Sequence, residues 1–293
     1  MDTSLAPPVP TPLGGFSLLS LRGPDALAFA QAQFCNDVLA LADGQWQWNG
    51  WLTPKGRVVA LFALLRLDPA RVWLVLPDFD ARALAEPLRR YVFRSKLAIE
   101  PLDGYRACAV PLPEGGFQAP ERARIDGDRI TLDFGTQQRP RALGILPAAD
   151  VPGPPDPALD MAWRHFDLEH GLSRIDPDTD QAWTPQMLSL DRLRAYSVKK
   201  GCYPGQEIVA RTHFLGQAKR GLVQVLADAP LRPGATVIDH EGRTLGPLVC
   251  VASDDRACRA LAILPLASPA TEDGWQVAGE PVRVSPIGDG LSR

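Results

Sequence analysis

The sequence predicts an α+β protein that ends in a small β-barrel, and two observations carry that prediction. Over residues 16–101, strand-like apolar runs alternate with two segments of helical spacing. After Gly221 the residue pattern changes to five short β-rich runs separated by turn-forming residues. Apolar residues make up 45% and charged residues 22% of the chain, which is enough to bury a large core without disulfides.

The first domain is expected to open with a strand and a helix. Residues 16–21 read as a strand, and Gly23-Pro24-Asp25 opens a helix because proline fits a first helical turn. The β-rich runs 45–52 and 57–66 flank the turn residues 53–56. This arrangement predicts a β-hairpin.

After the hairpin, the same domain is expected to continue with a further strand over 71–76 and a second helix. Asp78 is the expected N-cap of that helix. Pro87 predicts a kink or an early end. A strand over 95–101 closes the set, and the inward positions of the helix are expected to be Leu84, Leu88 and Tyr91.

The second half has a weaker pattern before the barrel. Residues 111–160 are dense in proline and glycine, with a strand expected over 131–134. Helices are expected over 161–170, ending at Gly171, and over 187–193. The predicted units are a mobile arm, a first α+β domain, a second α+β domain and the barrel, over 1–15, 16–110, 111–219 and 220–293.

Charge and cysteine content exclude several classes of protein. A net charge of −3 and a pI of about 5.8 leave no general basic surface for phosphate, so direct tRNA binding is doubtful. Five cysteines without C-x-x-C spacing signal neither a disulfide framework nor a zinc site. The longest apolar run, 58–65, is too short to span a membrane, and no signal peptide is evident. A cytoplasmic protein is expected.

The segment from Lys199 to Arg211 carries the strongest chemical signal. Gly201 and Pro204-Gly205 predict a tight turn that places Cys202 just before a helix. The helix dipole and nearby cations would favour thiolate over thiol. A cysteine on a turn is nevertheless more often a small packed residue, so an ordinary structural role stays open.

Aromatic residues form a second signal. Trp46 and Trp48 share one face of a predicted strand, while Trp51 lies on the other, and Trp163 lies in the helix before Gly171. Such rings could stack on a flat pterin or base, although in strands and helices they are mostly core. The four histidines lack metal-ligand spacing, and we predict no metal site apart from a transient ligand role for Cys202.

The motif itself resembles a known family. The run Lys200-Gly201-Cys202-Tyr203-Pro204-Gly205-Gln206-Glu207 matches the K-G-C-Y-x-G-Q-E signature of the YgfZ family, relatives of the glycine-cleavage T-protein. Further matches follow in the family's order. They are Gly23-Pro24-Asp25, Lys55-Gly56-Arg57, residues 91–96, residues 184–191, Arg211 and residues 216–220.

This resemblance implies a three-domain ring, with two interleaved α+β domains and a C-terminal barrel. It implies tetrahydrofolate or a derivative as ligand, a role in assembly or maintenance of iron–sulfur clusters, and an effect on tRNA modification. Partners would be iron–sulfur assembly proteins or target enzymes. Cys202 carries over as the functional thiol, with Trp163 and Phe16 as folate contacts and with motif support from Lys200, Gly201, Tyr203, Gly205, Gln206, Glu207 and Arg211.

Two departures refine the expectation. Arg194-Ala195 replaces two glycines of the family pattern, which puts the local backbone path in question. Residues 55–61 lack the carboxylate that an aminomethyltransferase needs for proton transfer, so a T-protein-type reaction is disfavoured. A folate-dependent one-carbon transferase acting on tRNA or a small acceptor remains the alternative, and a purely structural partner protein is the third possibility.

Overall fold

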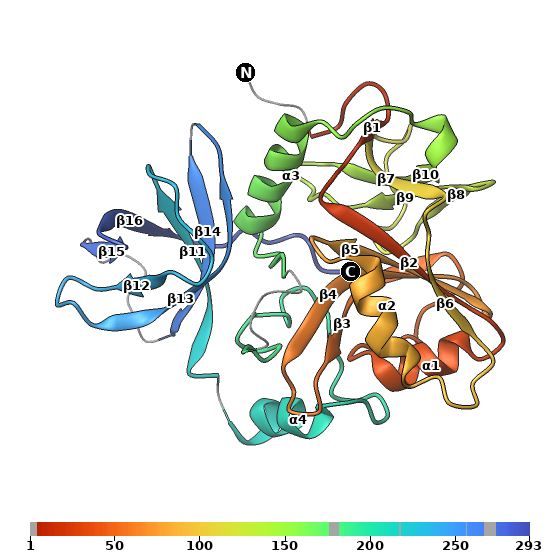
Figure 1. Cartoon of the computed structure of the whole chain (residues 1–293), viewed down its shortest axis with the longest axis horizontal. Helices are drawn as coiled ribbons and strands as arrows, with labels where there is room; N and C mark the ends of the chain where they lie inside the picture. Colours follow the sequence, from red (N-terminus) through yellow and green to blue (C-terminus); the bar gives the residue numbers. More distant parts are fainter. Residues whose placement is uncertain (1–4, 176–181, 217, 256, 267–273) are drawn as a thin grey trace.

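The computed structural model describes residues 5–175, 182–216, 218–255, 257–266 and 274–293. It shows two packed α+β units and a separate barrel (Figure 1). Within these residues, no helix combines the length and apolar character needed to cross a membrane. The expected α+β fold with a C-terminal β-barrel is confirmed.

The first α+β unit is a five-stranded antiparallel sheet with two helices. Its order is β3-β4-β5-β2-β6. The strands are β2 (Phe16–Arg22), β3 (Gln45–Leu52), β4 (Val58–Asp68), β5 (Arg71–Pro77) and β6 (Ala98–Pro101). The helices are α1 (Ala26–Gln33) and α2 (Ala81–Arg89). The predicted hairpin is therefore present as β3 and β4.

Strand β4 shows why this sheet is buried on both faces. Leu61, Ala63 and Leu65 join one cluster, while the alternate side chains of Ala60, Phe62 and Leu64 join the other. Alternation sends successive side chains to opposite faces of a sheet. One face therefore packs beneath α1 and α2, and the other packs against the second unit.

Two local expectations in this unit are wrong, and the early helix end expected from Pro87 is confirmed. The N-cap of α2 is Asp80, whose carboxylate accepts from the Arg82 amide at 2.9 Å, and Asp78 lies outside the helix. Tyr91 lies beyond the helix end and is 38% exposed. Helix α2 accommodates Pro87 and ends two residues later, so proline marks its last turn.

The second α+β unit has a sheet in the order β1-β7-β10-β9-β8. Its strands are β1 (Thr11–Pro12), β7 (Tyr105–Val110), β8 (Arg124–Asp126), β9 (Arg129–Asp133) and β10 (Ala142–Pro147). A 3₁₀ turn (Ala148–Asp150) leads to α3 (Pro157–Glu169), and α4 (Gln206–Leu215) follows a long irregular stretch. The helix expected over 187–193 is a series of turns instead, with Ser189 at φ +51°.

The expected mobile arm is wrong for its described part. Thr11–Pro12 pairs with β7, and Leu5 is buried with its carbonyl oxygen 3.1 Å from the indole nitrogen of Trp163. These contacts tie the segment to the second unit although it precedes the first in sequence. Strand β7 also belongs to the second sheet, although residues 105–110 were expected in the first domain.

The barrel is closed, with strand order β11-β14-β13-β12-β15-β16. Its strands are β11 (Arg220–Ala227), β12 (Thr236–Ile238), β13 (Thr244–Ser253), β14 (Cys258–Pro265), β15 (Trp275–Val277) and β16 (Glu280–Ser285). Helix α3 packs on β13 and β14 and so joins the barrel to the α+β units (Figure 1).

Candidate functional site

Cys202 lies in the turn that precedes α4. All five cysteines fall within the described residues, and Cys202 alone is exposed. Burial raises the pKa of the Cys35 and Cys250 thiols to about 12 and that of Cys108 to about 11. The fold therefore presents one thiol to solvent and buries the other four.

Lys200 was expected as one of the cations that favour the Cys202 thiolate, but its ammonium is used elsewhere. Its side chain is buried, and its ammonium donates to the carbonyl oxygens of Phe34 at 2.5 Å and Asn36 at 3.1 Å, and to that of Gln31. These carbonyls lie at and just beyond the C-terminal end of α1, where helix carbonyls lack partners and carry partial negative charge. Lys200 thus fastens the motif to the first unit.

The other polar side chains of the motif close the turn on itself. The hydroxyl of Tyr203 donates to the carbonyl of Ser197 at 3.2 Å, and the Gln206 amide donates to the carbonyl of Lys200 at 3.0 Å. The hydroxyl of Ser197 accepts from the backbone N–H groups of Lys199 and Lys200. This network holds the backbone on both sides of Cys202.

The two glycines of the motif have different roles. Gly205 is at φ +80°, and a Cβ there would lie 2.6 Å from the Gly56 Cα in the β3–β4 turn. Gly205 therefore allows both a left-handed backbone and a close docking of two turns. Gly201 lies outside the left-handed region, and a Cβ there would meet nothing within 4 Å.

The last members of the motif lie on α4. Glu207 and Arg211 are exposed, whereas Val209 is buried and its carbonyl accepts from the Gln186 amide at 2.9 Å. The helix is thus anchored through Val209, and Glu207 and Arg211 lie on its exposed side.

Arg194 and Ala195, which replace two glycines of the family pattern, lie in a turn that packs against residues 35 and 36. Arg194 adopts φ +54°, the left-handed conformation that glycine would supply more readily. Its carbonyl accepts from the Asn36 amide at 2.6 Å, and the carbonyl of Ala195 accepts from the Cys35 thiol at 3.4 Å. The positive charge of Lys200 acts to lower the pKa of the Cys35 thiol, against the larger effect of burial, which raises it.

Phe16 and Trp163 are brought together by the fold. Their ring centroids are 6.0 Å apart at an edge-to-face angle of 90°. Trp163 is fully buried, its indole N–H donates to Leu5, and the guanidinium carbon of Arg141 lies 4.2 Å from its ring centroid. Phe16 is half-buried and forms the accessible member of the pair.

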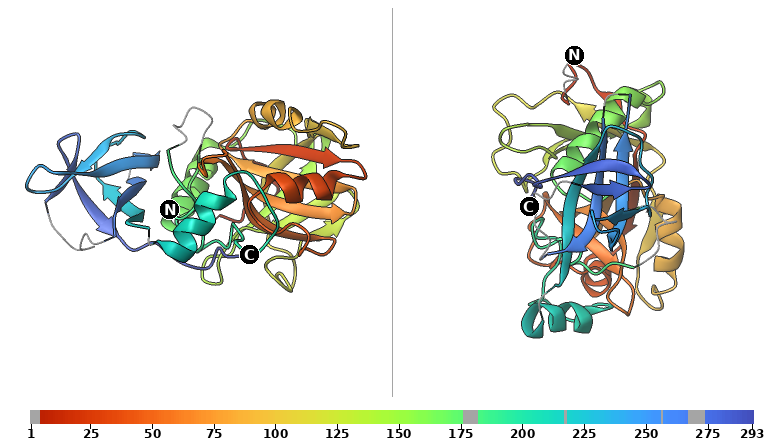
Figure 2. Two further views of the ribbon diagram at one scale, coloured as in Figure 1. Left: turned by 90° about the horizontal axis from the view of Figure 1, so that it is seen from below. Right: turned by 90° about the vertical axis from the view of Figure 1, so that its left-hand side faces the viewer.

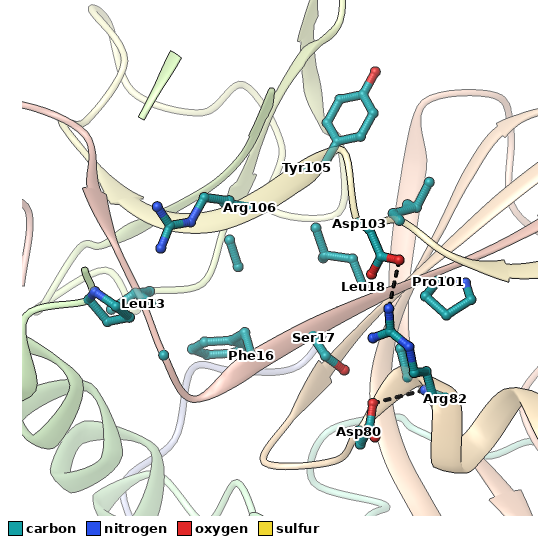
Figure 3. Close-up of a pocket in the computed structure, with 15 residues that line it drawn as sticks. Leu13, Phe16, Ser17, Leu18, Asp80, Arg82, Pro101, Asp103, Tyr105 and Arg106 are labelled. Carbon is teal, nitrogen blue, oxygen red and sulfur yellow. Dashed lines mark hydrogen bonds and ion pairs between the residues drawn. The ribbon is translucent and has the colours of Figure 1, made fainter. Parts of the chain in front are cut away.

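Two open pockets meet at Phe16. The first, about 320 Å³, runs between β2, β7 and the start of α2, and its polar side chains include Arg82 and Asp103, which form an ion pair at 2.7 Å (Figure 3). The second, about 480 Å³, is lined by Gly15, Phe16, Asp78 and Arg164. Both are lined by the Phe16 ring together with charged side chains.

A chain of ion pairs runs from the second pocket into the core. Arg164 pairs with Asp78, Asp78 with Arg174 at 3.0 Å, Arg174 with Asp167 at 2.7 Å, and Asp167 with Arg141. Burial lowers the pKa of Arg141 to about 10, which still leaves it charged at neutral pH. Burial also acts against the charge of Arg174, but the Asp167 and Asp78 carboxylates raise its pKa. Three arginines against two aspartates leave one excess positive charge.

One feature of the sequence points to this chain of ion pairs. Asp167 lies four residues after Trp163, on the buried face of the helix, where a lone carboxylate requires a buried partner. Arg174 follows Asp167 by 7 residues and Arg141 precedes it by 26, and neither spacing by itself identifies an ion-pair partner, so the fold is needed to identify both.

Cys202 and the Phe16 pair lie in different places. The turn of Cys202 and α4 dock on the tip of the β3–β4 hairpin, at the lower end of the molecule, whereas α3 lies at its upper end (Figures 1 and 2). Neither pocket beside Phe16 includes a residue of the motif. Among the described residues, no three His, Cys, Asp or Glu side chains are placed to hold a metal ion.

Similarity to known proteins assigns the chain to a family. The tRNA-modifying protein YgfZ of Cronobacter sakazakii is 30% identical over 231 residues, which cover 72% of this chain and 68% of that one. The chain belongs to the YgfZ family. The YgfZ protein of Vibrio vulnificus is 27% identical over 277 residues, covering 86% of this chain and 83% of its own.

Two further similarities concern the architecture of this YgfZ-family chain. Residues 219–288 match the C-terminal beta-barrel domain of CAF17, which coincides with the closed barrel. The glycine cleavage system aminomethyltransferase T from Bartonella henselae superposes with a TM-score of 0.69 over 96% of this chain and 86% of that one, at 19% sequence identity. The chain therefore shares the fold of that protein.

Proposed function

We propose that this YgfZ-family chain is a cytoplasmic, tetrahydrofolate-binding accessory protein that supports iron–sulfur cluster assembly or maintenance, and thereby tRNA modification. The observation that carries the proposal is the motif turn. Lys200, Tyr203, Gly205 and Gln206 are all used to hold the backbone, and the one side chain left exposed in the turn with chemical reactivity is Cys202. The names of the relatives, tRNA-modifying proteins, support the tRNA link.

A single exposed thiol suits an intermolecular role. An iron–sulfur cluster takes about four protein ligands, so Cys202 would act as a transient ligand and a partner would supply the others. Such a partner is an assembly protein or a target enzyme. The open space over Gly201 and the exposed Glu207 and Arg211 leave room for that contact.

The pockets at Phe16 support the folate part of the proposal. The Phe16 ring offers an aromatic edge, and the Arg164 guanidinium, which shares the pocket with Asp78 and Asp80, offers a cation for a carboxylate of the glutamate part. The stretch 55–61, which forms the hairpin tip and the start of β4, carries no acidic residue. An accessory role is therefore favoured over aminomethyl transfer.

The thiol is tested by replacing Cys202 with serine in a bacterium that lacks its own YgfZ. We expect lower iron–sulfur enzyme activities and an altered profile of modified tRNA nucleosides, measured by mass spectrometry. Cys258→Ala removes a buried thiol from the barrel and serves as the matched control. Full activity of the Cys202→Ser strain would remove Cys202 from the mechanism.

Folate binding is tested with purified protein. Tetrahydrofolate must raise the melting temperature if it binds the folded state. Absence of any shift at saturating ligand would contradict the folate part. Consumption of methylenetetrahydrofolate in the presence of tRNA would instead favour the alternative function, a folate-dependent one-carbon transferase.

A further inference from the structure

The C-terminal segment, residues 286–293, leaves the barrel after β16 and runs as irregular chain to the centre of the molecule (Figure 1). It is held along its length by both α+β units. The backbone N–H of Gly288 donates to the carbonyl of Glu169 at 2.8 Å, and the carbonyl of Gly288 accepts from Arg192 at 2.6 Å.

The end of the C-terminal segment is embedded among aromatic rings. Leu291 is 2% exposed, and its carbonyl accepts from the indole N–H of Trp48 at 2.7 Å. The guanidinium of Arg293 donates to the carbonyls of Asp133 at 2.8 Å and Gly135 at 2.7 Å. Its carbon lies 5.4 Å from the ring centroid of Trp46.

These rings are continuous with the aromatic pair of the proposed folate site. Phe134 stacks on Trp46 with centroids 5.2 Å apart, and it lies 5.1 Å from Trp48. On its other side, Phe134 is 6.2 Å from Phe16, which in turn contacts Trp163. The Arg293 binding site and the pockets at Phe16 therefore lie at two ends of one aromatic cluster.

The contacts of Arg293 match those that a pterin needs. A guanidinium is planar, donates from a fork of N–H groups and stacks on aromatic faces. The 2-amino-4-oxopyrimidine edge of a pterin contains the same N–C–N unit with N–H donors, and its carbonyl oxygen can accept from an indole N–H. Trp46, Trp48 and the carbonyls of Asp133 and Gly135 thus offer one donor, two acceptors and a stacking surface.

We propose that the C-terminal segment occupies the pterin subsite of this chain, with Arg293 in place of the pterin edge, and must leave for tetrahydrofolate to bind there. The inference rests on the proposed folate binding. It assigns the pterin to Trp46, Trp48 and Asp133 and the glutamate end to the Phe16 pockets.

The charges around the Arg293 guanidinium are consistent with its replacement by a pterin ring. The Asp133 carboxylate lies 3.5 Å from the Arg293 guanidinium. Burial raises the pKa of Asp133, while the charge of Arg293 acts in the opposite direction. Departure of Arg293 would leave a half-buried carboxylate without its cation, and N–H donors of an incoming ring would replace that interaction.

Hydrogen exchange measured by mass spectrometry on the full chain tests the exchange directly. Tetrahydrofolate should speed exchange of the amides of the C-terminal segment and slow exchange at the start of β2 and in α3. Protection around Phe16 with no faster exchange in residues 286–293 would overturn this inference and leave the proposed folate binding intact. No change anywhere would overturn both.

A variant gives the second test. Arg293→Ala weakens the hold of the segment, and a tenfold larger open fraction lowers the apparent Kd for tetrahydrofolate about tenfold. p-Aminobenzoylglutamate, which lacks the pterin, should bind both proteins equally. Arg283→Ala, on an exposed barrel strand, is the matched control. Equal or weaker tetrahydrofolate binding by Arg293→Ala would contradict the proposal.

Discussion

The ammonium of Lys200 lies 2.5 Å from the carbonyl oxygen of Phe34, so the charge of the signature motif holds the end of α1. Asn36 supplies a second carbonyl at 3.1 Å, and the ring centroid of Tyr203 lies 5.0 Å from the same nitrogen. The lysine therefore joins the motif to the first α+β unit.

Replacing Lys200 with methionine should destabilise the protein. The change keeps the aliphatic volume but leaves buried carbonyls at the end of α1 without a donor, which costs about 1–3 kcal/mol. Lys199→Met alters the exposed neighbour and should change stability by less than about 0.5 kcal/mol. Urea unfolding followed by circular dichroism measures both. Equal losses would show that the carbonyl contacts of Lys200 contribute little.

The two glycines of the motif should respond differently to alanine. Gly205→Ala forces a side chain into a left-handed backbone and against Gly56, and we expect a loss of more than about 1 kcal/mol. Gly201→Ala meets open space and should leave the free energy of unfolding nearly unchanged. If Gly201→Ala nevertheless impairs iron–sulfur enzyme activity in cells, the space beside Cys202 serves a partner. A large stability loss at Gly201 would contradict this division.

Local pattern was sufficient for most of the fold. The β3–β4 hairpin and the barrel strands were predictable because alternation and turn residues act over a few positions. Asp78 was mistaken for the cap of α2, since two aspartates stand within one turn and only geometry distinguishes them. The turns over 187–193 were mistaken for a helix because their apolar spacing is helical, whereas Ser189 takes a left-handed conformation.

The candidate site was predictable only in part. Cys202 follows from its motif, and its exposure agrees with a functional thiol. The role of Lys200 depends on carbonyls more than 160 residues earlier in the chain, and the ion pair of Asp167 with Arg141 joins residues 26 positions apart. The position of Arg293 against Trp46 likewise results from tertiary packing. No short-range pattern encodes such contacts.

Asp167→Asn should be strongly destabilising. Asp167 is fully buried and pairs with both Arg141 and Arg174, so its neutralisation leaves two buried guanidinium groups under-compensated. Loss of one partner from a buried pair costs about 3–5 kcal/mol. Asp228→Asn removes an exposed pair with Arg283 and should cost less than about 1 kcal/mol. Chemical unfolding compares them, and similar costs would show that the buried chain is weakly coupled.

Acidification should destabilise the protein through two histidines of α3 and its C-cap. Burial lowers the pKa of His165, opposed by Asp254 and Glu169 and assisted by Arg259. Burial also lowers the pKa of His170, opposed by its bond to Phe166 and by Glu169 and assisted by Arg139 and Arg141.

Because both pKa values lie below the usual value of about 6.5, the unfolded chain binds more protons than the folded chain as the pH falls through that value. The stability present above pH of about 6.5 is therefore lost on acidification. The double variant His165→Gln/His170→Asn should show a shallower fall in the free energy of unfolding between pH of about 7 and 5, measured by urea titration. An unchanged slope in the double variant would assign the acid sensitivity to carboxylates.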